Sequence, residues 1–325
     1  MWVVILGGLV IYKLLRRFFS DDVVSDVEAS DVDVLFSVAT RLEKLFGGKS
    51  YTGLRIPDPD SGSRQDIDLV LLTKWEALVI SVHNYAGVVS VSSDGSWVCF
   101  DPGRGREERY PDPVTIAQKK ALVLEAYLEQ RGVILPEGFL SWKVILPNPK
   151  FCTLNASILS SLPPEIITYG QWEQLKPEQK NMLPRWMKGA FCGGKKEIQE
   201  SVHQQLDFIL STAPMWDRLE LRGNKFLLGE FVEFKGNPDD VLALRAIRRS
   251  KVNRLLVQKT SMFGLAPRRL QVLYTPRDYR SEGASSSEWK EVTVRSNTEI
   301  LFRPENSSKV CKFKLSAVTS MALSA

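Results

Sequence analysis

The chain has 325 residues, of which 44% are hydrophobic and 25% charged, and its formal net charge is +5. This composition excludes an intrinsically disordered protein, and the length suggests about two domains with cores of their own. Four cysteines are scattered without a C-x-x-C pair. Their spacing argues against structural zinc and a disulfide scaffold, and favours a reducing compartment.

Segment 1–19 departs from this globular composition. Apolar residues run without interruption from Trp2 to Tyr12, and the basic residues Lys13, Arg16 and Arg17 follow. A spanning helix needs about 20 apolar residues, and snorkelling basic side chains would make about 17 usable here. The charges follow the run, unlike those of a cleaved signal peptide, so we predict a membrane anchor with the body of the chain in the cytosol. A helix packed on the protein or lying in the membrane interface is the alternative.

Segment 20–30 is acidic, since six Asp or Glu and no Lys or Arg lie between Phe19 and Leu35. This pattern predicts a solvated spacer, and an acidic helix start is the alternative. The α/β domain that we predict over 31–214 begins with a helix at 31–47. Strand patterns follow at 51–56, 66–73, 77–84, 87–93 and 96–100, and Asp94-Gly95 predicts a hairpin between the last two.

The second half of this predicted domain alternates helices and strands. Asp112 is placed to cap a helix over 112–132, with Pro113 at its first position. Apolar runs predict strands at 142–147 and 166–170, and a long helix is expected at 195–210. The remaining residues, 215–325, show short alternating runs that predict a smaller β-rich domain, a barrel or a sandwich.

Two adjacent predicted strands carry residues that can do chemistry. Asp66 and Asp68 share one face of the first strand, and Ser81 and His83 share one face of the next, because side chains alternate along a strand. Neighbouring strands with an acid on one and an acidic-x-Lys ending on the other form the scaffold of a metal-dependent phosphodiesterase. In such a site the carboxylates hold Mg²⁺ and the lysine stabilises developing charge.

The stretch "QDIDLVLLTKWEALVISVHNYAGVVSVSSDGSWVC" resembles the core of the nuclease-related domain (NERD) family. The resemblance extends over roughly residues 31 to 211. It implies a restriction-endonuclease-like α/β fold, with a mixed sheet flanked by helices, of the PD-(D/E)xK type. Family-matched positions are the metal-binding Asp68, then Asn84, Gly87 and Trp97, and the helix motif Asp112, Pro113 and Gln118, with Asp in place of the family's Asn.

The sequence departs from the family at the positions that matter most. Ser81 stands where the resemblance implies a metal-binding Glu, and His83 where it implies the Lys. A hydroxyl is a poor ligand for Mg²⁺, so the strand end reads as that of a degenerate nuclease, a pseudoenzyme. If the site is active, Mg²⁺ or Mn²⁺ is the expected cofactor, with Asp66 as replacement carboxylate beside Asp68. Asp31 or Asp33 could then fill a further acidic position.

A basic stretch lies in the second predicted domain. Residues 241–270 contain eight Lys or Arg and no acid: Arg245, Arg248, Arg249, Lys251, Arg254, Lys259, Arg268 and Arg269. Such a stretch favours phosphates, either of nucleic acid or of anionic lipid headgroups, or it is simply a solvated basic face.

Three hypotheses follow for the function. The first is a membrane-anchored, catalytically degenerate module that binds DNA, RNA or a protein partner. The second is an active divalent-metal-dependent nuclease that uses Asp68, Asp66 and His83. The third is a structural adaptor acting through its β-rich C-terminal domain.

Overall fold

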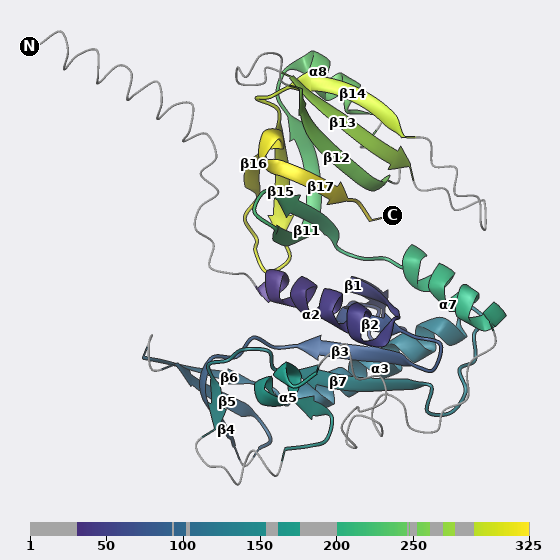
Figure 1. Cartoon of the computed structure of the whole chain (residues 1–325), viewed down its shortest axis with the longest axis vertical. Coiled ribbons are helices and arrows are strands. Elements are labelled where there is room, and N and C mark those ends of the chain that lie inside the picture. Colours follow the sequence, from purple (N-terminus) through teal and green to yellow (C-terminus); the bar gives the residue numbers. More distant parts are fainter. Residues whose placement is uncertain are drawn as a thin grey trace, which may run out of the picture. The chain divides into compact units, whose positions relative to one another are not determined.

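The computed structural model describes residues 31–92, 94–101, 105–153, 162–175, 200–245, 247, 252–260, 269–276 and 289–324. They form two compact units that divide between Met215 and Trp216 (Figure 1). The predicted anchor 1–19 and spacer 20–30 lie outside the described residues. Within the described part, no helix is both long enough and apolar enough to cross a membrane.

The first unit is built on a mixed five-stranded sheet. Its strands run in the order β1-β2-β3-β7-β9, with β1 to β3 antiparallel and β3, β7 and β9 parallel. The bounds are β1 Lys49–Pro57, β2 Arg64–Leu72, β3 Ala77–Val82, β7 Leu140–Ile145 and β9 Ile166–Ile167. The fold class predicted for this region is confirmed.

Two helices cover this sheet because its central strands are apolar on both faces. Helix α3, Pro113–Glu129, packs on the face that carries Val70 and Val79. Helix α2, Asp31–Phe46, packs on β1 and β2, and the residues that it buries belong to a separate cluster. The expected cap of α3 is present, since the Asp112 carboxylate accepts the first free N–H groups of the helix.

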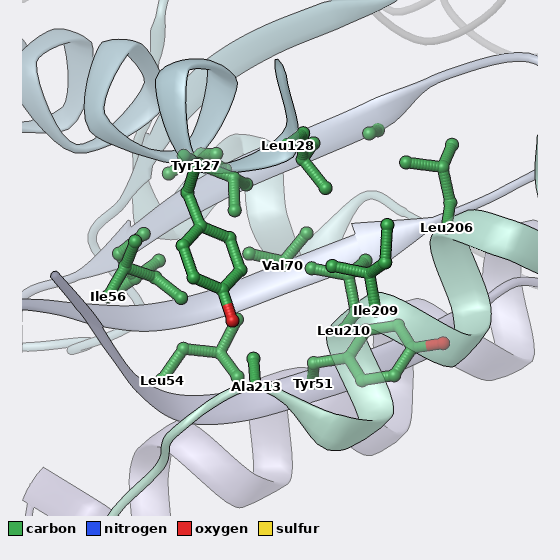
Figure 2. Close-up of a cluster of buried hydrophobic side chains, with 14 of the residues drawn as sticks. Tyr51, Leu54, Ile56, Val70, Tyr127, Leu128, Leu206, Ile209, Leu210 and Ala213 are labelled. Atoms are coloured by element: carbon green, nitrogen blue, oxygen red, sulfur yellow. The ribbon is translucent and has the colours of Figure 1, made fainter. Parts of the chain in front are cut away.

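Figure 2 shows the core under α3. Tyr127 and Leu128 of α3 point toward Val70 on β2, and helix α7, Glu200–Thr212, adds Leu206 and further apolar side chains from the other end of the unit. A helix that begins about seventy residues after the end of α3 therefore completes this core.

A second, four-stranded sheet lies at the end of β3. Its order is β6-β5-β4-β8, with bounds β4 Gly87–Val91, β5 Trp97–Asp101, β6 Arg106–Tyr110 and β8 Phe151–Thr153. The predicted hairpin is confirmed, with Gly95 at a φ of 82° in the turn between β4 and β5. Strand β6 was not predicted, because its sequence REERY has no apolar alternation.

The predicted strand at 166–170 is only partly correct. Ile166 and Ile167 pair with β7, but the chain then turns at Thr168 into the short helix α5, Tyr169–Glu173. Arg41 of α2 holds the end of α5 by donating to the carbonyl oxygens of Trp172 and Leu175, both at 3.0 Å. These bonds satisfy carbonyl groups that a helix end leaves without partners.

The second unit is a single antiparallel sheet of eight described strands, in the order β14-β13-β12-β17-β10-β11-β15-β16. Its elements are β10 Asp217–Leu221, β11 Lys225–Lys235, α8 Pro238–Ala243, β12 Val252–Thr260, β13 Arg269–Pro276, β14 Lys290–Arg295, β15 Glu299–Pro304, β16 Cys311–Lys314, the 3₁₀ turn Leu315–Ala317 and β17 Val318–Ala322. The expectation of a β-rich C-terminal region is confirmed.

The apolar side chains of this sheet form a core of their own. One cluster contains Val294 of β14, at one end of the strand order, and Ile300 and Phe302 of β15, near the other. The cluster therefore extends across most of the width of the sheet.

Candidate active site

Asp68 lies on β2 with its carboxylate at the end of β3. Its Oδ2 accepts the backbone N–H of Val82 at 3.1 Å, and its Oδ1 accepts the Lys120 ammonium at 2.9 Å. The Asp68 side chain is 26% exposed and that of Lys120 is 10% exposed. Both carboxylate oxygens are thus engaged by donors from the protein itself.

Lys120 comes from the buried stripe of α3. It lies three residues after Ala117 and four before Leu124, which are both fully buried. A lysine in such a stripe needs a partner, since an isolated buried ammonium is strongly unfavourable. Sequence reasoning missed Lys120, although a charge inside an apolar helical stripe was the signal that could have found it.

Ser81 is fully buried beside this pair. The register Leu69↔Ile80 puts Ser81 next to Asp68 on the neighbouring strand. Among the described residues, its Oγ has no hydrogen-bond partner. The position that the family pattern gives to a metal-binding carboxylate therefore holds a neutral hydroxyl inside the protein.

His83 follows the end of β3 instead of lying within it, since the strand ends at Val82. Its backbone N–H donates to the Ile145 carbonyl at 3.1 Å, and its ring stacks on Tyr85 with centroids 5.0 Å apart. Burial lowers the pKa of His83 below its ordinary value, against the opposing pull of the Asp68 carboxylate. The imidazole is therefore neutral at neutral pH, and its buried Nε2 has no partner.

The remaining predicted catalytic and metal residues lie outside this cluster. Gln118 is exposed on α3, and two helical positions correspond to about 200° of rotation, so it projects away from the side of Lys120. Asp66 is on the same face of β2 as Asp68, but its side chain is 55% exposed and lies 3.7 Å from the Arg55 guanidinium. Of the predicted set, the structure brings together Asp68, Ser81 and His83.

Acidic residues of α2 reach only the rim of the cluster. Asp31 Oδ1 accepts the side-chain amide of Asn84 at 3.2 Å, and the Asp31 charge acts on His83. Asn84 is held in turn, since Asn148 donates to its carbonyl oxygen at 3.2 Å. The family-matched Asn84 thus ties the end of β3 to α2.

The donor set of this cluster does not fit Mg²⁺. A magnesium site needs oxygen ligands that include free carboxylates. Asp68 is already bound to an ammonium and a backbone N–H. Among the described residues, no group of three or more His, Cys, Asp or Glu side chains could hold a metal ion.

The residues of this cluster lie in a region that matches a known protein family. Residues 34–144 match the model of the nuclease-related domain, NERD. This region is a nuclease-related domain. The match covers β1 to β3 and α3, and so includes Asp68, Ser81, His83 and Lys120. No curated protein and no solved structure matches the chain.

The basic stretch 241–270 belongs to the second unit, outside the NERD match. Arg245 is exposed just after α8, and Arg269 is exposed at the start of β13. Arg254 and Lys259 lie on β12, a strand that the sequence analysis did not predict. The other four basic residues lie outside the described part of the chain: Arg248, Arg249, Lys251 and Arg268.

Proposed function

We propose that this chain is a membrane-anchored NERD protein that binds nucleic acid and whose nuclease-like unit no longer hydrolyses phosphodiesters. One observation carries the proposal: the Lys120 ammonium lies 2.9 Å from Asp68 Oδ1, where a nuclease of this type would hold a metal ion. The positive charge that a metal would supply to this carboxylate comes from the protein itself.

The chemistry of hydrolysis supports this proposal. Metal-dependent phosphodiester cleavage needs a cation that binds the scissile phosphate and activates the attacking water. An ammonium has no open coordination position and does not acidify water as a bound metal does. The neighbouring groups do not compensate, because Ser81 is a neutral buried hydroxyl and His83 is a neutral buried imidazole.

The active nuclease is the competing hypothesis, and a cleavage assay separates the two. The full chain is incubated with labelled single- and double-stranded DNA and RNA in Mg²⁺ or Mn²⁺, beside Asp68→Asn and the matched control Asp66→Asn. We expect no cleavage by any of the three proteins, and binding that persists in EDTA. Cleavage that Asp68→Asn abolishes and Asp66→Asn retains would overturn the proposal.

Support for membrane anchoring comes from the N-terminal sequence, in which Lys13, Arg16 and Arg17 follow the apolar run. A charge at the centre of a spanning helix costs about 2.5–3.5 kcal/mol. The full chain should therefore stay in the membrane fraction after alkaline extraction, while the variant Ile5→Lys/Val10→Lys should be released. Release of both proteins to the same extent would refute the anchor.

A further inference from the structure

Two arginines face each other across neighbouring strands of the second unit. Arg269 begins β13 and pairs directly with Arg295 at the end of β14. Side chains at such positions have Cβ atoms about 4.5–5.5 Å apart, and like charges there repel. The pairing therefore places two guanidinium groups within reach of one bound anion.

The same face continues with hydrogen-bonding side chains. Gln271 and Thr293 form the next outward pair, two residues further along each strand. Leu273 and Glu291 then end the basic part of the surface. We call Arg269, Gln271, Thr293 and Arg295 the arginine face. Its rigid support is the buried side of the same two strands: Leu270, Val272 and Val294.

The carboxylate of Asp239 neutralises Arg295 only weakly. Asp239 Oδ2 lies 3.9 Å from the Arg295 guanidinium, and the two side chains are 86% and 50% exposed. Ion pairs this long and this exposed are worth about 0–1 kcal/mol. The Arg295 guanidinium can therefore exchange this partner for a stronger anion at little cost.

Strand pairing brings Arg295 to the basic stretch, although it lies 25 residues beyond the end of that stretch at Leu270. Arg269 is the penultimate residue of the stretch, and the register Arg269↔Arg295 joins the two. Sequence reading alone assigned phosphate binding to residues 241–270 and had no reason to include Arg295.

We infer that the arginine face binds the backbone phosphates of a nucleic acid strand, with Arg295 as a binding residue. Guanidinium groups bind phosphate through paired N–H donors, and Thr and Gln side chains commonly contact phosphate and sugar oxygens. A lipid surface is the less fitting anion, since membrane-surface sites combine basic residues with apolar ones that insert. The outward residues beside the arginine pair are polar. This inference rests on the proposed function and adds where its ligand binds.

The test measures binding of the full chain to fluorescein-labelled DNA and RNA strands over a range of salt concentrations. The variant Arg269→Gln/Arg295→Gln removes the two charges. We expect it to weaken binding at least about tenfold and to lower the slope of log affinity against log salt by about 2, one for each lost phosphate contact. Arg269→Lys/Arg295→Lys should retain the slope and lose only part of the affinity, because lysine keeps the charge without the paired donors.

The matched control removes two exposed charges from the other end of the same sheet, with Lys309→Gln/Lys312→Gln. It should change the affinity much less. If both double variants weaken binding equally, the effect is general charge loss and the inference is wrong. It is also wrong if the arginine variant binds nucleic acid normally but loses binding to phosphatidylserine vesicles. Absence of nucleic acid binding by the unaltered chain would instead refute the proposed function.

Discussion

Replacement of Lys120 by methionine tests how firmly Asp68 is committed to the ion pair. Methionine keeps most of the apolar stem of lysine and removes the ammonium, so the Asp68 carboxylate loses its charged partner. Removal of one partner from a buried pair costs about 3–5 kcal/mol. Because the Asp68 side chain is 26% exposed and partly solvated, we expect a loss below this range, about 2–3 kcal/mol.

Urea unfolding of the full chain, followed by circular dichroism, measures this loss. The matched control is Lys119→Met, one position earlier on α3 and exposed, which should change the free energy of unfolding by less than about 0.5 kcal/mol. The double variant Lys120→Met/Asp68→Asn should recover most of the loss, because the amide oxygen still accepts the Val82 N–H without an unpaired charge. If Lys120→Met is no more destabilising than Lys119→Met, the carboxylate is not committed and the reasoning against metal binding fails.

Three further predictions concern the same strands and the second unit. Ser81→Glu places a second carboxylate beside Asp68, so Mn²⁺ should raise the unfolding temperature of this variant and leave that of the unaltered chain unchanged. If Mn²⁺ raises the unfolding temperature of neither protein, the pocket does not accept a metal. Burial lowers the pKa of His83 from 6.5, so below about pH 6.5 the unfolded chain binds a proton that the folded chain does not, and stability falls. His83→Phe, which keeps a ring on Tyr85, should lose less free energy of unfolding between about pH 7 and pH 5, and an identical pH dependence would contradict the shifted pKa. Gly229→Ala would make the new Cβ clash with the Arg303 carbonyl oxygen, so it should destabilise the second unit by about 1–3 kcal/mol. A proteolysis rate equal to that of the unaltered chain would contradict this clash.

The parts of the fold that sequence analysis predicted follow strong local rules. Strands β2 and β3 were predicted from continuous apolar runs, which occur because both faces of these strands are buried. The start of α3 was predicted from Asp112 at the N-cap and Pro113 at the first helical position. Strands β6 and β12 were missed because neither shows a regular alternation of apolar and polar residues. The sequence of β6 is REERY, and that of β12 is VNRLLVQKT, in which polar and charged residues flank a short apolar run.

Sequence patterns predicted the part of the candidate site that lies on two neighbouring strands. Asp68, Ser81 and His83 follow from two neighbouring strands whose register is short and regular. The apolar stripe of α3 signals that Lys120 is buried, but its pairing with Asp68 depends on the packing of α3 on the sheet, which no local pattern gives. The structure places Gln118 on another side of α3 from Lys120, because two positions along a helix correspond to about 200° of rotation.

The contact between Asp68 and Lys120 changes what the presence of an acid at position 68 can mean. The two residues lie 52 positions apart and join β2 to α3, so each is needed to offset the burial of the other. A chain that had given up catalysis would still lose stability if Asp68 mutated alone. Selection for folding is then enough to keep the acid, so an Asp at position 68 is not by itself evidence of hydrolysis.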